Sequence, residues 1–428
     1  MDSIPPWVPV SSEDKSAKMN RLEGGVSLSH WLNKNLALLF AARVIRSITQ
    51  AFLVIVVPIY LARLGFSAVQ IGTLFMGTTI GGALLILAVG IGADRWGRKR
   101  AIIVLAVLQA LGAAGFVLSA NLAVLTLSSA AGTIGRGGGA GSGGAFGPFY
   151  PAEQPLLSEH AESKYRNEVF GFLSFLGVLG GAVGSLLAAV PQLWPGGPFG
   201  WRTGYLFLFA LTVFSSLLLI AVVLPVSERK RTVKRQPFQL SWRLLAKFSV
   251  TNVFNGLGIG FLGPLLTYWF YARFGAGPAA VGVLFTIVNL LTALPYLISA
   301  YLGNRFGVVR TVAVTRAIAV TLTGVMAFSQ TYFMAGTLFA LRMVFNSLGN
   351  PLRQSMVMGM SDEGERSTMA AFSNLPMQVS SALTPPLGGF LMDEGMLGLP
   401  LLLAAGFQGI NTVLYWRFFR GVRNKDLH

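Results

Sequence analysis

Long apolar runs separated by short polar segments fill the chain from residue 36 to residue 420. A helix needs about 20 apolar residues to cross about 30 Å of hydrocarbon, and twelve runs reach that length. The pattern predicts an all-α membrane protein with twelve transmembrane helices at residues 36–62, 68–92, 100–120, 122–150, 167–190, 201–225, 246–272, 278–302, 309–330, 332–358, 367–392 and 398–420.

The two halves of this pattern repeat each other. Motifs of the first half recur in the second half at a nearly constant spacing. Ala62-Arg63-Leu64-Gly65 matches Ala272-Arg273-Phe274-Gly275, Arg95-Trp96-Gly97 matches Arg305-Phe306-Gly307, and the pair Pro151 and Gln154 matches the pair Pro351 and Gln354. Parallel repeats in a membrane imply a central cavity and alternating access by rocking of the halves. The predicted divisions are an arm (1–35), a six-helix half (36–225), a basic linker (226–245), a second six-helix half (246–420) and a tail (421–428).

Composition excludes several classes of protein. Only 11% of the residues are charged, against about 25% in soluble proteins, so a soluble enzyme is excluded. The chain has no Cys and only three scattered His residues, so we expect no metal site and no cofactor. Its net charge of +17 lies in short clusters between apolar runs, which argues against a nucleic-acid partner.

The basic clusters predict the orientation in the membrane. Lys and Arg are concentrated in the arm, the even-numbered loops and the tail, whereas Arg63, Arg202 and Arg273 alone lie in the loops on the other side. Because such residues favour the cytoplasmic side, both termini are predicted to be cytoplasmic. Residues 1–31 lack the apolar core of a signal peptide. We expect a monomer in the cell (inner) membrane, surrounded by the lipid bilayer.

The loop after the second predicted helix reads Gly90-Ile91-Gly92-Ala93-Asp94-Arg95-Trp96-Gly97-Arg98-Lys99-Arg100. It resembles the signature loop of the major facilitator superfamily, and with the duplicated halves the resemblance covers residues 36–420. The resemblance implies a transporter in which Asp94 caps the start of helix 11, near Arg366, and holds the cytoplasmic side closed. An Asp is favourable at a helix N-terminus because of the helix dipole.

We call the expected contact between the Asp of this loop and a helix of the other half the clasp. In the second-half copy of the loop, Asn304 replaces the Asp and Val308 replaces the Arg, so a weaker clasp is expected there. The predicted gating residues are Gly90, Asp94, Arg95, Gly97, Arg98, Asn304, Arg305, Gly307 and Arg366.

Charged residues within the apolar runs are candidates for function, because a charge inside a membrane is costly. Glu153 is the leading proton site, and the alternative is an ordinary ion pair with Arg43 or Arg166. Arg43 lies near the cytoplasmic end of the first span, where it is expected to be interfacial or gate-forming. Arg136 is followed by a Gly-rich segment that resembles one in exporters of the family; the alternative is a structural Arg bonded to backbone carbonyls.

Substrate candidates are polar residues on the predicted spans, and for a residue such as Tyr268 the alternative is a place in the interfacial aromatic belt. They are Arg46, Gln50, Arg136, Asn252, Asn255, Tyr268, Asn289, Arg342, Asn346 and Gln378. No acidic residue is predicted at the depth of Arg46, Arg136 and Arg342, so we expect a preference for anionic solutes.

The sequence therefore predicts a secondary active transporter of a small organic solute, with no enzymatic activity. A proton-coupled exporter is the first interpretation, by resemblance to drug-efflux proteins. An importer or facilitator of a small metabolite, with anions as one candidate class, is the alternative within the same class. A transporter-like sensor or a lipid-handling protein is the alternative from a different class.

Overall fold

The computed structural model describes residues 32–135, 147–162, 165–194, 196–228, 242–359 and 366–421. All regular secondary structure in these residues is helical. The α-helices are α2 (Lys34–Arg63), α3 (Ala68–Trp96), α4 (Arg98–Leu118), α5 (Leu122–Gly132), α6 (Tyr150–His160), α7 (Arg166–Leu187), α8 (Val190–Leu193), α9 (Thr203–Val223), α10 (Trp242–Leu262), α11 (Leu266–Phe274), α12 (Pro278–Phe306), α13 (Val308–Met326), α14 (Tyr332–Gly359), α15 (Arg366–Asp393) and α16 (Leu399–Phe419).

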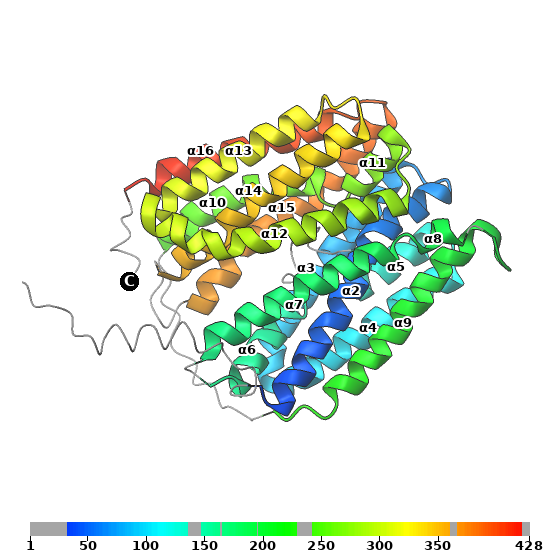
Figure 1. Cartoon of the computed structure of the whole chain (residues 1–428), viewed down its shortest axis with the longest axis horizontal. Helices are drawn as coiled ribbons and strands as arrows, with labels where there is room; N and C mark the ends of the chain where they lie inside the picture. Colours follow the sequence, from blue (N-terminus) through cyan, green and yellow to red (C-terminus); the bar gives the residue numbers. More distant parts are fainter. Residues whose placement is uncertain are drawn as a thin grey trace, which may run out of the picture.

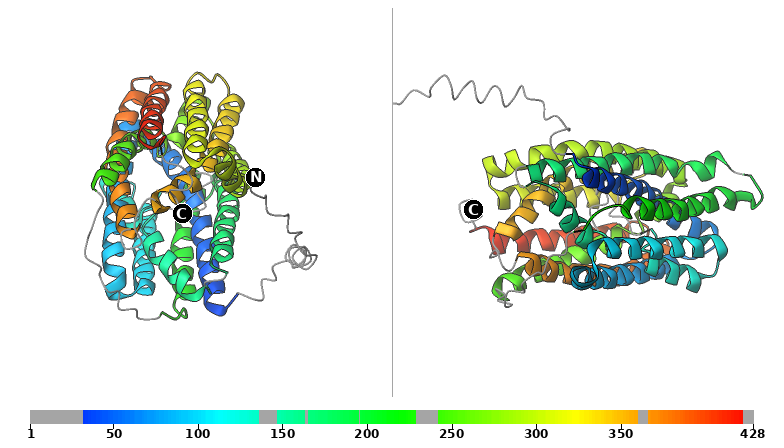
Figure 2. Two further views of the ribbon diagram at one scale, coloured as in Figure 1. Left: turned by 90° about the vertical axis from the view of Figure 1, so that its left-hand side faces the viewer. Right: turned by 90° about the horizontal axis from the view of Figure 1, so that it is seen from below.

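These helices form two bundles that lie side by side. We call α2 to α9 the first half and α10 to α16 the second half. The second half lies above the first in Figure 1. In the left-hand view of Figure 2, yellow to red helices lie mostly in the upper part of the molecule and blue to green helices mostly in the lower part. Helix α3 of the first half packs along α15 of the second, and α7 packs along α12.

Most of the expected membrane spans are present as helices. Among the described residues, nine helical stretches are long and apolar enough to cross a membrane. The spans expected at 122–150, 332–358 and 367–392 do not meet that measure, although α14 and α15 are long continuous helices. The prediction of an all-helical membrane protein is confirmed.

The fourth expected span, at 122–150, is wrong as a single helix. Helix α5 ends at Gly132, and Thr133 takes the left-handed conformation with φ 51°. The hydroxyl of Ser129 donates to the carbonyl of Ile134 at 2.7 Å, which closes this end of the helix. A separate helix, α6, begins at Tyr150. Hydropathy did not reveal the break, because most of the residues between the two helices are apolar.

At one end of the molecule the halves meet backbone against backbone. We call this the closed end, and it includes residues 64–67, 119–121, 188–194, 196–202 and 275–277. A Cβ atom on Gly72 of α3 would lie 2.3 Å from the carbonyl oxygen of Pro385 in α15, and one on Gly282 of α12 would lie 2.4 Å from that of Ser185 in α7. Helices this close leave no room for a side chain.

The opposite end includes residues 97, 161, 162, 165, 224–228 and 307 and carries most of the charged side chains discussed below. We call it the basic end. The two halves converge at the right of Figure 1, where α8 and α11 lie, and separate toward the left, where α6 lies. Every hydrogen bond described below between the halves lies toward the closed end.

Gly72→Ala should destabilise the protein, because the new methyl group meets a backbone carbonyl that cannot rotate away. Overpacking of this kind costs about 1–3 kcal/mol, so the midpoint of thermal unfolding in detergent should fall by several degrees. Gly90→Ala is the matched control on the same helix, since a Cβ there has nothing within 4 Å. Equal midpoints for the two variants would contradict the close packing.

Candidate functional site

A buried ion-pair cluster lies inside the first half. Glu153 of α6 accepts hydrogen bonds from Arg43 Nη1 at 2.9 Å and from Arg46 Nη2 at 2.6 Å, both at its Oε2 atom. The two arginines lie one turn apart on α2, so they present their side chains on the same face of the helix. Arg43 is 1% exposed and Glu153 is 4% exposed. We call these three residues the triad.

Aromatic and aliphatic side chains isolate the triad from water. The guanidinium of Arg46 lies over the ring of Phe149, 4.9 Å from its centroid, which is a cation–π contact. Glu153 lies in the first turn of α6, where the helix dipole favours a negative charge. A small recess opens beside the cluster and is lined by Leu39, Ala42, Arg46, Ile102, Phe149, Glu153, Leu219 and Val223.

The triad corrects two expectations from the sequence. Arg43 is not interfacial: its side chain points inward to Glu153, and its Nε atom is buried without a hydrogen-bond partner. Arg46 is not an uncompensated cation, because Glu153 pairs with it. The ion pair between Glu153 and Arg43, the alternative expected from the sequence, is present, and Arg46 joins it. The triad as a whole carries one net positive charge.

The buried arginines of the second half have neutral partners. Arg342 of α14 donates from Nε to the hydroxyl of Thr323 at 2.9 Å. Arg316 of α13 donates to the side-chain oxygen of Asn411, whose amide nitrogen donates to the carbonyl of Thr251 at 2.8 Å. Neither Arg forms an ion pair with a carboxylate among the residues that the structure describes.

The remaining substrate candidates are spread over both halves. Asn289 donates to Ser185 at 3.4 Å across the boundary between the halves, and Asn255 donates to the sulfur of Met377 at 3.2 Å. Gln50 is half-buried, and its Oε1 atom lacks a partner. Four more candidates lie within the helices: Asn252 is buried, and Tyr268, Asn346 and Gln378 are half-buried. Arg136 lies outside the described residues.

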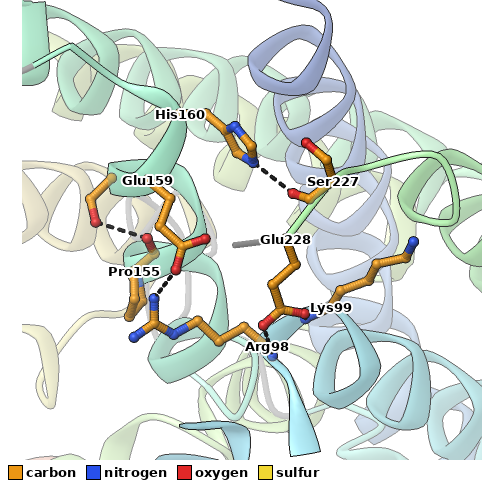
Figure 3. Close-up of polar contacts among 8 residues, drawn as sticks. Arg98, Lys99, Pro155, Glu159, His160, Ser227 and Glu228 are labelled. Atoms are coloured by element: carbon orange, nitrogen blue, oxygen red, sulfur yellow. Dashed lines mark hydrogen bonds and ion pairs between the residues drawn. The ribbon is translucent and has the colours of Figure 1, made fainter. Parts of the chain in front are cut away.

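The signature loop forms a second polar cluster, at the basic end of the first half (Figure 3). The carboxylate of Glu228 accepts from the backbone N–H of Arg98 at 2.5 Å and of Lys99 at 3.2 Å, and so caps the start of α4. The guanidinium of Arg98 forms an ion pair with Glu159 of α6. Gly97 has φ 103°, which a residue with a side chain rarely adopts, and a Cβ there would meet Glu228.

His160 ties further segments to this cluster, as Figure 3 shows. Its Nε2 atom donates to the carbonyl of Ser227 at 2.8 Å, and its own carbonyl accepts from Asn33 at 2.9 Å. Asn35 donates to the hydroxyl of Ser227 at 2.8 Å. The starts of α2 and α4 and the ends of α6 and α9 are therefore held together.

The predicted gating residues divide into three groups. Arg98 and Gly97 belong to the cluster at the start of α4. In the second-half copy, Gly307 has φ 86° and Arg305 donates to the hydroxyl of Tyr301 at 2.7 Å. Gly90 and Arg95 are exposed on α3. The side chains of Asp94, Asn304 and Arg366 lie outside the described part of the structure.

Sequence reasoning missed Phe149, Glu159 and Glu228 as members of these clusters. Glu228 follows the sixth span and lies near the start of the basic linker, so it resembles an ordinary loop residue. Its role depends on the distance between the end of α9 and the start of α4, which only the fold determines. A useful signal was the scarcity of carboxylates: the chain has only 16 Asp and Glu residues.

Removing the carboxylate of the triad should cost more stability than removing one arginine. Glu153→Gln leaves two buried cations without a counter-charge, which costs about 3–5 kcal/mol, whereas Arg43→Gln leaves one neutral pair. The midpoint of thermal unfolding should therefore fall much further for Glu153→Gln. Glu162→Gln, at an exposed position just after α6, should leave it unchanged. A larger loss for Arg43→Gln would refute the arrangement.

Comparisons with known proteins agree with this fold. The chain is 20% identical over 443 residues to an uncharacterized membrane protein of Saccharomyces cerevisiae, YJR124C, covering 92% of this chain and 96% of that protein. A bacterial homolog of the human lysosomal transporter Spinster, solved in an inward-facing conformation, is 13% identical with a TM-score of 0.70, and the match covers 92% of this chain and 97% of that one. A bacterial homologue of the iron transporter ferroportin, also inward-facing, is 14% identical with a TM-score of 0.70, and the match covers 90% of this chain and 98% of that one. The model of the Major Facilitator Superfamily matches residues 39–254 and again residues 248–427, and the chain belongs to this superfamily of transporters.

Proposed function

We propose that the chain is a proton-coupled carrier that exports a small organic solute, and that Glu153 is its proton site. The observation that carries this proposal is the triad, in which one buried carboxylate is held by two guanidinium groups from another helix. A proton-coupled carrier needs a carboxylate whose charged neighbours change between conformations.

The arrangement of the helices supports such a change. Glu153 lies on the short helix α6, which is separate from α5, whereas both arginines lie on the long helix α2. With both arginines in contact, the ionised carboxylate is stabilised. A movement of α6 away from α2 removes both guanidinium groups together and leaves a buried carboxylate that favours the protonated form. Proton binding and release then follow the conformational cycle.

We further propose that the closed end faces away from the cytoplasm. The Lys and Arg bias of the loops supports this orientation, and the two similar solved structures are inward-facing. In this orientation both termini are cytoplasmic, and Asp94 lies at the cytoplasmic end of α3. Its proposed role is to cap the start of α15 when the cytoplasmic side closes.

The proposed solute is anionic, and the second half supplies the attraction. Arg316 and Arg342 are buried with neutral partners. At the position that matches Glu153 in the repeat, the second half carries Arg353. Buried cations in a low dielectric create a positive potential that a carboxylate or phosphate relieves.

Coupling can be tested in a variant that keeps the net charge of the triad. Glu153→Gln combined with Arg43→Gln retains one positive charge, so it avoids two uncompensated cations. In inverted vesicles, with a carboxylate-bearing fluorescent dye as the probe, this double variant should lose uptake driven by a pH gradient and retain dye exchange. Arg43→Gln alone should still respond to the gradient. Gradient-driven uptake by the double variant would remove Glu153 from the coupling mechanism.

The charge preference can be tested with carboxylate-bearing and amine-bearing versions of one fluorophore. Reconstituted wild-type protein should transport the anionic version faster. Arg342→Gln should reduce that preference several-fold, because it removes a buried cation. Arg417→Gln is the control, since Arg417 is exposed at the end of α16. Faster flux of the cationic version through the wild type would overturn the proposal.

A further inference from the structure

A carboxylate joins the two halves at the closed end. The Oδ1 atom of Asp393, the last residue of α15, accepts from the backbone N–H of Ala68 at 2.7 Å. Its Oδ2 atom accepts from the N–H of Val69 at 2.9 Å. Ala68 is the first residue of α3, so an Asp of the second half caps the N-terminus of a helix of the first half.

A related but weaker contact lies at the matching place in the repeat. Gln192, in α8 of the first half, accepts from the N–H of Ala279 in α12 of the second half at 2.6 Å. Helix α12 begins with Pro278, whose nitrogen carries no hydrogen. This helix therefore offers one donor where α3 offers two, and it meets a neutral amide instead of a carboxylate.

We propose that Asp393 is the principal gating residue of the closed end, with Gln192 as its weaker counterpart. The first N–H groups of a helix have no partner within the helix, and an anion there also interacts favourably with the helix dipole. Separation of the halves at this end breaks both bonds to Asp393, which sets the free energy of opening. This inference requires only that the halves rock against each other, and it does not depend on the proposed proton site or substrate charge.

The packing around Asp393 fixes the geometry of the contact. Gly389, one turn earlier in α15, lies against the backbone of α3: a Cβ there would be 2.1 Å from the carbonyl oxygen of Ala68. This approach brings the last turn of α15 directly over the first turn of α3. Ser67 additionally caps α3 from within its own half and forms a capping box with Gln70, so the start of α3 remains a helix when Asp393 leaves.

The absence of cysteine from the chain allows a direct test. Spin labels on Ala120→Cys and Gln330→Cys, at exposed positions in opposite halves, report the separation of the closed end in proteoliposomes. Asp393→Asn should raise the ratio of molecules with a long label-to-label distance to molecules with a short one about fivefold, because loss of a charged helix cap shifts an equilibrium by about that factor. Glu394→Gln is the matched control, because the neighbouring residue is exposed, and it should leave the distances unchanged.

A second variant tests the same contact without altering Asp393. Ala68→Pro removes the 2.7 Å donor and installs the residue type that α12 carries at its own first position. Proline is tolerated there, and Ser67 already has the extended backbone that precedes proline. This variant should shift the distances in the same direction as Asp393→Asn and by less.

Distance distributions that match the wild type for both Asp393→Asn and Ala68→Pro would overturn the inference. A shift as large for Glu394→Gln as for Asp393→Asn would also overturn it, because general loss of negative charge would then explain the effect. Asp94→Asn separates this inference from the proposed cytoplasmic clasp. Asp94→Asn should leave the closed end closed. Opening of the closed end in this variant would contradict the proposed role of Asp94 at the cytoplasmic side, and it would not change the conclusion about Asp393.

Discussion

Helix N-termini within a membrane protein need partners for their first N–H groups, and this constraint organises both ends of the molecule. Within the part of the chain that the structure describes, three helix starts receive a side chain from a different helix or segment: α3 from Asp393, α4 from Glu228 and α12 from Gln192. The cap on α4 lies within the first half and holds that bundle together. The caps on α3 and α12 cross the boundary between the halves. The same physical need therefore stabilises one half internally and connects the two halves reversibly.

The second constraint is the cost of charge in a low dielectric. The buried arginines of the described residues are Arg43, Arg46, Arg316 and Arg342, and Glu153 is the buried carboxylate among them. In the first half the carboxylate lies between two arginines, so it compensates one of their two positive charges. In the second half the cations have hydroxyl and amide partners. This asymmetry between otherwise similar repeats places the proposed proton chemistry in one half and the proposed attraction for an anion in the other.

The sequence predicted the helical membrane fold because each span is a long apolar run, and the duplicated motifs indicated two related halves. It could not predict the break between α5 and α6, since a left-handed turn at Thr133 leaves no mark in hydropathy. For the site, the scarcity of carboxylates was enough to select Glu153. Arg43 was expected as a possible partner, but Arg46 was not, because it is 107 positions away and meets Glu153 only through the packing of α2 against α6. The role of Asp393 likewise depends on a residue 325 positions away.

The central claim is that transport requires the two halves to separate at the closed end. The most direct test links Ala120→Cys to Gln330→Cys with a cleavable bis-maleimide in proteoliposomes and measures flux of a carboxylate-bearing dye. Linked protein should transport no faster than empty liposomes, and cleavage of the linker should restore flux. Protein bearing the same reagent on one Cys alone should transport normally. Undiminished flux through the linked protein would contradict the account.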